Sequence, residues 1–508
     1  MVDKIILFFK DLNERQILIL LIVVTFGLRL YAVLMAQGMA YDSAAYGFMA
    51  RDFIKGDWIK GLSSPAPPFY PLLIFLFSPD STSVEMIGRW ISLACGTFAV
   101  IPMFYLVKQE IGQKEGILSA VFYSIHPYLV TYSGMLLTEA TYWGLLILSV
   151  YFFWTGLKKE SAWRMALSGC FLGLAYLTRP EGIGYVLVYL LWILVRDGLK
   201  KKWLKKIILI GALILTVLIF VVPYILYIHQ ETGQWLISKK GLGTQSQLFI
   251  TGGEEGGASK SLGQRILEQK NSQFKKIIQN VIQFFPFVVY HYLRAYHFSL
   301  WVFLIFGFIC VRRKIIAYEL FIASLVLFHL FSLSTFVPST IRFAVPLIPL
   351  SLFWASEGIL KIKSYLEKFK IFNPERVIFL LLLCVMVIQL PQGLKPERGH
   401  RTSQKTVGLW LKQNTPSGTV IMSNSPQEVF YAEREFIMFP SVAPQPEGSA
   451  ESYQEIIRYV KNRGVRYILV NKNTQETNPG FMKSIQGVDL KEIYKKSEES
   501  LMIYEVIY

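Results

Sequence analysis

Four short polar segments stand out in a very apolar sequence because they contain the side chains best suited to chemistry. Their candidate side chains are Asp42 in segment 38–51, Glu139 in 135–140, Arg179 and Glu181 in 177–182, and Arg342 in 339–349. A carboxylate can accept a proton from a hydroxyl or an amine, and an arginine can bind an anion through parallel hydrogen bonds. The segments are therefore candidates for proton transfer and for anion binding.

Each polar segment also has a purely structural interpretation, which the sequence leaves open. The alternatives are a helix cap for Asp42 or Ser43, a cap and a favourable helix dipole for Thr138 and Glu139, an ion pair across a tight turn for Arg179 and Glu181, and an interfacial position for Arg342. An arginine at membrane depth is nevertheless costly. Because of this cost, binding of a functional anion is an alternative role for Arg179.

The histidines give a weaker signal than the acidic and basic residues. His291 and Arg294 are three positions apart and would share one face of a helix. His291 and His297 have no carboxylate at matching spacing, so these two histidines do not define a metal site. The serine-elbow and His-Glu-x-x-His motifs of hydrolases are absent. The sequence therefore does not determine whether a divalent cation binds, and it contains no motif for a nucleotide or redox cofactor.

The composition indicates that membrane helices position these segments. Of the 508 residues, 53% are hydrophobic and only 17% are charged, whereas a soluble chain has about 25% charged residues. Apolar runs occur at about 16–35, 88–107, 116–134, 140–157, 165–178, 183–195, 207–228, 298–311, 315–335, 343–360 and 377–391. We therefore predict an α-helical polytopic membrane protein with about eleven transmembrane helices.

The basic residues define an orientation for these helices. If the N-terminus lies inside, the inner segments hold 22 Lys and Arg residues, whereas the short outer turns 133–139, 179–182 and 336–342 hold only Arg179 and Arg342. This asymmetry is the positive-inside pattern. It accounts for much of the net charge of +17 without a nucleic-acid partner. We expect a plasma-membrane protein with a cytoplasmic N-terminus.

Three parts are predicted on the extracytoplasmic side. Residues 1–391 form the transmembrane domain with two outer loops, 36–87 and 229–297, and the second loop contains an amphipathic run over 262–285. Residues 392–508 have the hydropathy of a soluble domain. Helices are expected at 403–413, 427–432 and 451–462, and strands at 418–423, 465–470, 488–494 and 501–507. This alternation predicts a small exported α/β domain, to which we assign no catalytic residue.

The order of the motifs resembles that of a known superfamily. In chain order, the motifs are Asp42 with its Ala/Tyr-rich helix, the segment 55–58, the proline-rich segment 65–71, Thr138 with Glu139, the segment 177–182 and the segment 342–349. Together they resemble the C-type glycosyltransferase (GT-C) superfamily, especially its protein-mannosyltransferase and aminoarabinose-transferase relatives. The resemblance covers the whole chain, and segment 464–470 is similar to the tail of prokaryotic members. Two departures are Ser43, where some relatives have a second acid, and Ala66, where aminoarabinose transferases have lysine.

The resemblance implies an inverting enzyme that moves a hexosyl or pentosyl group from a polyprenyl-phosphate donor to a lipid, glycan or protein acceptor among the membrane lipids. Asp42 matches the family's catalytic acidic position, and Glu139 is a second catalytic candidate that would orient the acceptor or hold Asp42. Candidate ligands of the donor phosphate are Arg179, Arg342 and Arg294, because the leaving phosphate gains negative charge. Further candidates are Glu181, His291 and Tyr46.

A second class of function remains open from the sequence. A multi-pass transporter or flippase of lipid-linked saccharides, with an exported sensor domain, would also combine many spans with a soluble tail. It would need ionisable residues and broken helices at mid-membrane. Here the candidate charges lie at the outer ends of the apolar runs, and no internal repeat is evident. These features favour the enzyme.

The orientation gives a first testable prediction. A membrane-impermeant thiol reagent added from outside should label Ser449→Cys but not Lys201→Cys, because the basic residues place position 201 inside. The parent protein, whose four cysteines fall within apolar runs, is the control for background labelling. Labelling of Lys201→Cys alone would contradict the orientation and every site assignment that depends on it.

Overall fold

A computed structural model describes residues 13–195, 203–241, 262–309, 316–335, 340–369, 373–395, 399–439, 450–477, 481, 485, 489–496 and 501–508. The labelling positions Lys201 and Ser449 lie outside the described residues. The chain forms two compact units, Met1–Leu34 with Trp58–Lys395, and Met35–Asp57 with Pro396–Tyr508. We call the first the membrane unit and the second the C-terminal module. The module thus combines the tail with a segment from the start of the chain.

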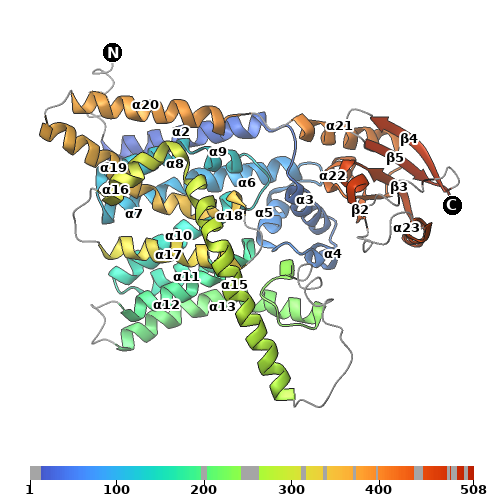
Figure 1. Ribbon diagram of the computed structural model, residues 1–508, viewed down its shortest axis with the longest axis horizontal. Helices are drawn as coiled ribbons and strands as arrows, with labels where there is room; N and C mark the ends of the chain where they lie inside the picture. Colours follow the sequence, from blue (N-terminus) through green and yellow to red (C-terminus); the bar gives the residue numbers. More distant parts are fainter. Residues whose placement is uncertain are drawn as a thin grey trace. The chain divides into compact units, whose positions relative to one another are not determined.

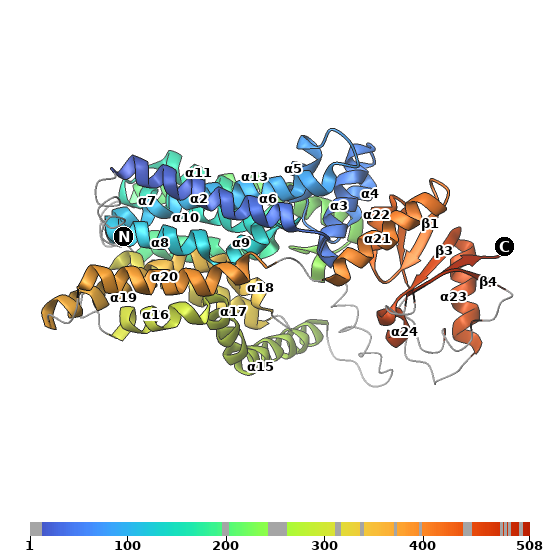
Figure 2. The same cartoon turned by 90° about the horizontal axis from the view of Figure 1, so that it is seen from above.

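The membrane unit is built from helices that coincide with the predicted apolar runs. They are α2 (Glu14–Met35), α6 (Val84–Phe98) with α7 (Val100–Glu110), α8 (Gln113–Ile125) with α9 (Pro127–Ser133), α10 (Glu139–Lys158), α11 (Ala162–Thr178), α12 (Tyr185–Val195), α13 (Trp203–Thr232), α16 (Phe298–Ile309), α17 (Ala317–Thr335), α19 (Ile348–Phe369) and α20 (Pro374–Gly393). These helices run roughly along one direction (Figures 1 and 2).

Among the described residues, seven helical stretches are long and apolar enough to cross a membrane by themselves. The remaining predicted runs are helical but shorter or interrupted, such as the run divided into α8 and α9 at Pro127. The prediction of an α-helical polytopic membrane protein with a small C-terminal α/β part is confirmed. The number of eleven spans stays a prediction.

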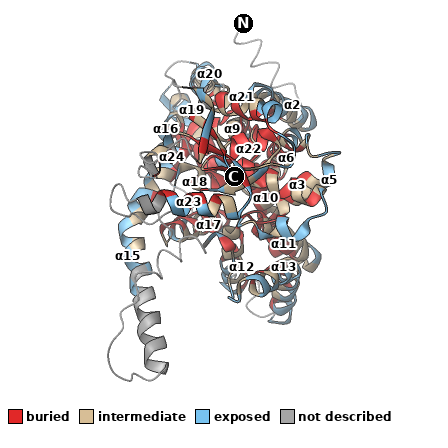
Figure 3. Cartoon of the chain, turned by 90° about the vertical axis from the view of Figure 1, so that its right-hand side faces the viewer, coloured by how far each residue is buried: buried red, intermediate tan, exposed pale blue. Residues whose placement is uncertain are grey.

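Burial divides the long helices into central and peripheral ones. In the most apolar windows of α10 and of Ile341–Phe369, 78% and 89% of residues are buried, whereas the corresponding values for α2, α13 and α20 are 22%, 28% and 17%. Figure 3 shows the exposed residues of these three helices on the outside. Apolar side chains such as Leu34, Leu215 and Val387 are more than half exposed there, as expected for helices that face lipid.

Shorter elements and one long helix complete the membrane unit. The short ones are α4 (Trp58–Ser63), α5 (Phe69–Phe77), η1 (Pro180–Gly184), η3 (Lys239–Gly241), α18 (Ile341–Ala344) and η4 (Val345–Leu347). The long helix α15 (Leu262–Tyr296) crosses the others steeply in Figure 1. The predicted amphipathic run over 262–285 is therefore helical, and the helix continues to Tyr296. The helix ends before His297, whose φ is +71°.

The C-terminal module is a mixed sheet with helices on both faces. The strands β1 (Val420–Ser423), β2 (Glu435–Met438), β3 (Val465–Val470), β4 (Leu490–Lys496) and β5 (Leu501–Val506) have the order β2-β1-β3-β5-β4. The β1–β2 and β1–β3 pairs are parallel, and the pairs that β5 forms are antiparallel. The helices are α3 (Tyr41–Ile54), α21 (Gly399–Asn414), α22 (Pro426–Ala432), α23 (Ala450–Asn462) and α24 (Lys472–Thr477).

Side chains alternate between the two faces of this sheet, as strand geometry requires. In β1, Ile421 packs with residues of α21 and α22, whereas Met422 packs with residues of α23. Phe48 of α3 packs against the first of these clusters. All the helices and strands predicted in the tail are present, although β2 and α24 were not predicted.

Candidate functional site

A single buried carboxylate, that of Glu139, binds two of the predicted arginines. The Glu139 side chain has no exposed surface, and its Oε1 accepts a hydrogen bond of 2.9 Å from Nη1 of Arg179 and a second one from Nε of Arg342. Thr138 occupies the N-cap position, so Glu139 is the first residue of α10. The positive end of the helix dipole therefore also stabilises its charge.

Arg179 lies where a proline ends its helix. Pro180 restricts the residue before it to an extended conformation, and Arg179 has φ −148° and ψ 126° directly after α11. Its side chain is only 3% exposed. Nη2 of Arg179 donates to Glu181 at 3.3 Å, and the guanidinium lies 4.9 Å from the centre of the Phe343 ring. The predicted pair across the turn is thus present, but Glu139 is a second anionic partner.

Arg342 is the more accessible of the two arginines. It lies on the single turn α18, and its side chain is 22% exposed. Nε2 of His329 (α17) donates to the carbonyl oxygen of Phe343 at 2.8 Å, and Nδ1 of the same ring is hydrogen-bonded to the hydroxyl of Tyr185 (α12), also at 2.8 Å. Two neighbouring helices therefore fix the turn that carries Arg342.

Tyr70, within the proline-rich segment 65–71, supports the turn before Glu139. Its buried hydroxyl lies 2.8 Å from the carbonyl oxygen of Gly88 and 2.8 Å from Oγ of Ser92, and Ser92 Oγ donates to the carbonyl of Leu137 at 3.1 Å. Leu137 is two residues before Glu139. No local sequence pattern indicates this role of Tyr70, because the contact depends on the packing of α5 against α6.

Asp42 belongs to the C-terminal module. The N-cap of α3 is Ala40, whose N–H donates to Oγ of Ser43 at 3.2 Å, and Asp42 is the second residue of the helix. The Asp42 side chain is partly buried, and Tyr46, one turn further, is buried. Burial raises the pKa of the Tyr41 phenol, and the negative charge of the adjacent Asp42 raises this pKa further.

Arg294 and His291 lie on α15, near its C-terminal end. Arg294 is exposed and forms no ion pair with any described residue. The ring of His291 contacts the Phe287 ring edge to face, with centroids 4.3 Å apart. Among the described residues, no group of three or more His, Cys, Asp and Glu side chains is arranged to hold a metal ion. The arrangement thus brings together Glu139, Arg179, Glu181 and Arg342.

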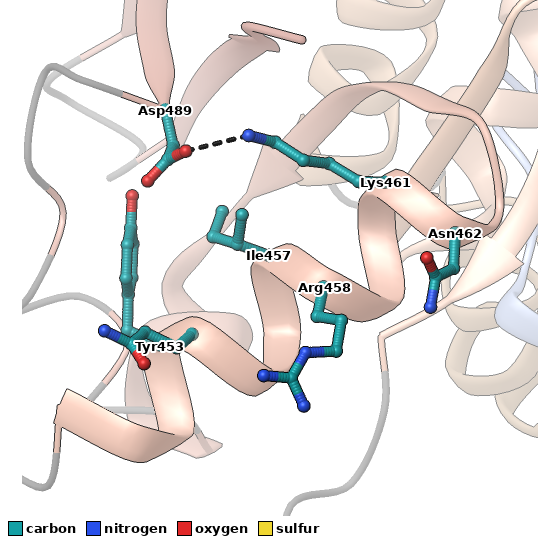
Figure 4. Close-up of a pocket in the computed structure, with 7 residues that line it drawn as sticks. Tyr453, Ile457, Arg458, Lys461, Asn462 and Asp489 are labelled. Carbon is teal, nitrogen blue, oxygen red and sulfur yellow. Dashed lines mark hydrogen bonds and ion pairs between the residues drawn. The ribbon is translucent and has the colours of Figure 1, made fainter.

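The C-terminal module contains a pocket of about 410 Å³. It lies between α23 and the start of β4, and Figure 4 shows the ion pair of 2.9 Å between Lys461 and Asp489 at its edge. The other residues that line the pocket are Tyr453, Gln454, Ile457, Arg458 and Asn462. The lining includes none of the predicted site residues.

Comparisons with known proteins agree with this architecture. Residues 65–227, less than half of the chain, match the family model described as dolichyl-phosphate-mannose-protein mannosyltransferase. The structure of ArnT from Cupriavidus metallidurans bound to undecaprenyl phosphate is similar, with a TM-score of 0.62 and 12% identity, over 96% of this chain and 97% of that chain.

A second similar structure is the oligosaccharyltransferase of Archaeoglobus fulgidus in its apo form. The TM-score is 0.50 and the identity 11%, over 94% of this chain and 72% of that chain. No curated protein sequence matches the chain. The chain therefore has the fold of the C-type glycosyltransferases, and the predicted resemblance to this superfamily is confirmed. The matched segment contains Glu139 and Arg179, whereas Asp42 and Arg342 lie outside it.

The buried ion pairs give a second prediction. Glu139→Gln should destabilise the protein by about 3–5 kcal/mol, because it leaves a buried arginine without its main anionic partner. The control is Glu160→Gln, since Glu160 pairs with the half-exposed Lys205 and such a pair contributes less than about 1 kcal/mol. Equilibrium unfolding in detergent micelles measures both. Equal stabilities of the two variants would contradict a structural role for Glu139.

Proposed function

We propose that this protein is an inverting membrane glycosyltransferase. It transfers a monosaccharide from a polyprenyl-phosphate donor to a lipid, glycan or protein acceptor on the extracytoplasmic face of a prokaryotic plasma membrane. The single observation that carries this proposal is the pair of arginines held by buried Glu139 at the ends of apolar helices. The fold similarity to ArnT bound to undecaprenyl phosphate supports a lipid phosphate as the leaving group.

On the donor side, the proposed chemistry requires cations beside the phosphate. As the bond between C1 of the sugar and the phosphate oxygen breaks, the polyprenyl phosphate leaves with the electron pair and gains negative charge. Arg342 and Arg179 stabilise this charge, and guanidinium suits the task because it stays charged and presents several donors in a plane. Arg342, with 22% of its side chain exposed, is the first contact, and Arg294 is a third candidate.

Glu139 acts in this proposal as a positioning residue. Its carboxylate is fully buried and bound to both arginines, so it fixes the orientation of the guanidinium groups before the donor binds. With Glu181 included, the two carboxylates balance the charges of Arg179 and Arg342, so the guanidinium groups act as oriented hydrogen-bond donors. Donors oriented in advance stabilise a developing charge without reorganising during the reaction. Glu181 adds a second contact to Arg179, and it contributes to the same orientation.

On the acceptor side, Asp42 is the proposed general base. The acceptor oxygen or nitrogen attacks C1 from the face opposite the phosphate, Asp42 takes the proton of the acceptor, and the configuration at C1 inverts. This is the role of the base in an inverting glycosidase, with the acceptor in place of water. The assignment rests on the match of Asp42 to the family's acidic position and on its place in the first turn of α3.

The donor assignment gives a third prediction. Arg342→Gln should weaken binding of undecaprenyl phosphate about 10- to 100-fold, because hydrogen bonds to charged groups contribute about 1.5–3 kcal/mol. Arg342→Lys should restore binding only in part. Arg164→Gln, in the first turn of α11, far from Arg179 at its other end, is the matched control. Unchanged affinity in Arg342→Gln would refute the phosphate contact.

The acceptor assignment gives a fourth prediction. Asp42→Asn keeps the size of the side chain and removes its basic oxygen, so the transfer rate should fall by about 10²–10⁴. Binding of the donor lipid should persist, because the phosphate ligands are other residues. Asp52→Asn, on the same helix, is the control for effects on α3. Sugar transfer is measured with purified protein whose folding is checked by thermal melting.

A folded, fully active Asp42→Asn variant would show that Asp42 is not the base. The transporter or flippase alternative predicts a different result, because it leaves the sugar on its lipid carrier. Formation of a glycosylated acceptor and of free undecaprenyl phosphate by wild-type protein in detergent, where there is no transport across a bilayer, distinguishes the two classes.

A further inference from the structure

The helix that carries Asp42 is packed into the C-terminal module, although about 380 residues separate it from its partners in the sequence. Phe48 lies against the module's core. Its ring meets that of Phe430 edge to face at 5.5 Å, and it stacks on Phe436 at 5.7 Å with 13° between the planes. Apolar contacts thus fix one face of α3 onto the module.

Arg51, in the last turn of α3, binds the same phenylalanine in two ways. Its guanidinium carbon lies 3.5 Å from the centre of the Phe430 ring, and Nη1 donates to the carbonyl oxygen of Phe430 at 2.6 Å. This carbonyl belongs to the last turn of α22, where the helix dipole favours a cation. Arg51 is only 7% exposed, so water does not screen the contact.

Gly47 allows this close approach. A Cβ atom at Gly47 would lie 2.4 Å from Cε2 of Phe430, which no side chain tolerates without movement. Gly47 and Arg51 are four residues apart and therefore share a face of α3. The helix is thus in contact with Phe430 over a full turn.

The chain that leads into α3 is also attached to the module. Oε1 of Gln37 accepts a hydrogen bond of 2.9 Å from Oγ1 of Thr402. Gly38 lies so close to Arg401 that a Cβ atom there would be 2.6 Å from the Arg401 Cβ. Both partners belong to the first turns of α21. Asp42 therefore lies between two attachments, one before the helix and one near its end.

We propose that the tail part of the C-terminal module supports α3 and so positions Asp42 for catalysis, with Arg51 and Phe430 as positioning residues. This inference rests on the proposed role of Asp42 as general base. A helix is stiff, so a shift at Arg51 moves Asp42, about 13 Å away along the axis. A misplacement of about 1 Å can cost about 10²-fold in rate. The tail thus sets the rate of transfer without supplying a catalytic group.

The first test separates turnover from donor binding. Arg51→Met keeps an unbranched apolar stem and removes both guanidinium contacts with Phe430, so kcat should fall at least 10-fold while the affinity for undecaprenyl phosphate changes less than 2-fold. Arg51→Lys retains a cation and should recover part of the loss. The matched control is Arg466→Met, because Arg466 is 55% exposed in the same module, and it should transfer sugar at the wild-type rate.

A double-mutant cycle tests whether Arg51 acts through Asp42. If it does, adding Arg51→Met to Asp42→Asn should change kcat less than 2-fold, because residues that act as a unit are not additive. In Arg51→Met alone, hydrogen exchange of the amides of residues 41–54 should become faster, while that of α10 is unchanged. If Arg51→Met does not fold, Phe430→Leu, which removes the ring contact and keeps the carbonyl, takes its place in the same measurements.

The outcomes distinguish the two levels of the proposal. Wild-type kcat in folded Arg51→Met and Phe430→Leu, together with an inactive Asp42→Asn, would overturn the positioning role and leave the proposed function intact. Additive losses in the double mutant would also overturn it. A fully active Asp42→Asn would instead refute the proposed function of Asp42, and the positioning inference would fall with it.

Discussion

The arrangement of the site in the membrane unit depends on one interaction, the binding of two arginines by the buried carboxylate of Glu139. This contact joins the first residue of α10 to the residue that follows α11 and to the turn α18. Burying these charges is expensive, and a well-packed apolar cluster would often be at least as stable. This unfavourable burial is explained if the arginines must be held in fixed orientations for an anionic ligand. Tyr70 and His329 then have a purpose in common, because each fixes a turn that carries one member of the cluster.

Most of the helical architecture could be predicted because the bilayer dictates it. A segment that crosses lipid must satisfy its own backbone hydrogen bonds, so it is helical and about 20 residues long. The prolines then set several boundaries, as Pro180 does for α11. In the tail, β3 and β5 are short apolar runs of mostly buried residues, and such runs indicate strands. The strand β2, at the edge of the sheet, has only four residues, begins with Glu435 and is partly exposed, so it offers no run long enough to detect.

The site could be predicted in its residue types but only partly in its contacts. The pair of Arg179 and Glu181 follows from their spacing across a turn. The contacts of Glu139 with Arg179 and Arg342 span 40 and 203 positions of the sequence. They arise from the packing of helices, and no local sequence pattern predicts which helices are neighbours in space. The same holds for Arg51 and Phe430, 379 positions apart. From the sequence, Asp42 is predicted in an outer loop, and no sequence pattern indicates that this segment shares a core with the tail.

The proposed chemistry places different requirements on the ligands of the phosphate and on the base. A polyprenyl phosphate is anchored by its chain in lipid, so the ligands of its phosphate must lie where apolar helices end, as Arg179 and Arg342 do. The base has a different requirement, because it must meet a polar acceptor and keep a charged carboxylate in contact with water. A partly buried side chain on a helix supported by an α/β module meets that requirement. The tail then has a physical reason to pack around α3: without a rigid support of its own, a base carried by a loop between membrane helices would lack a fixed position.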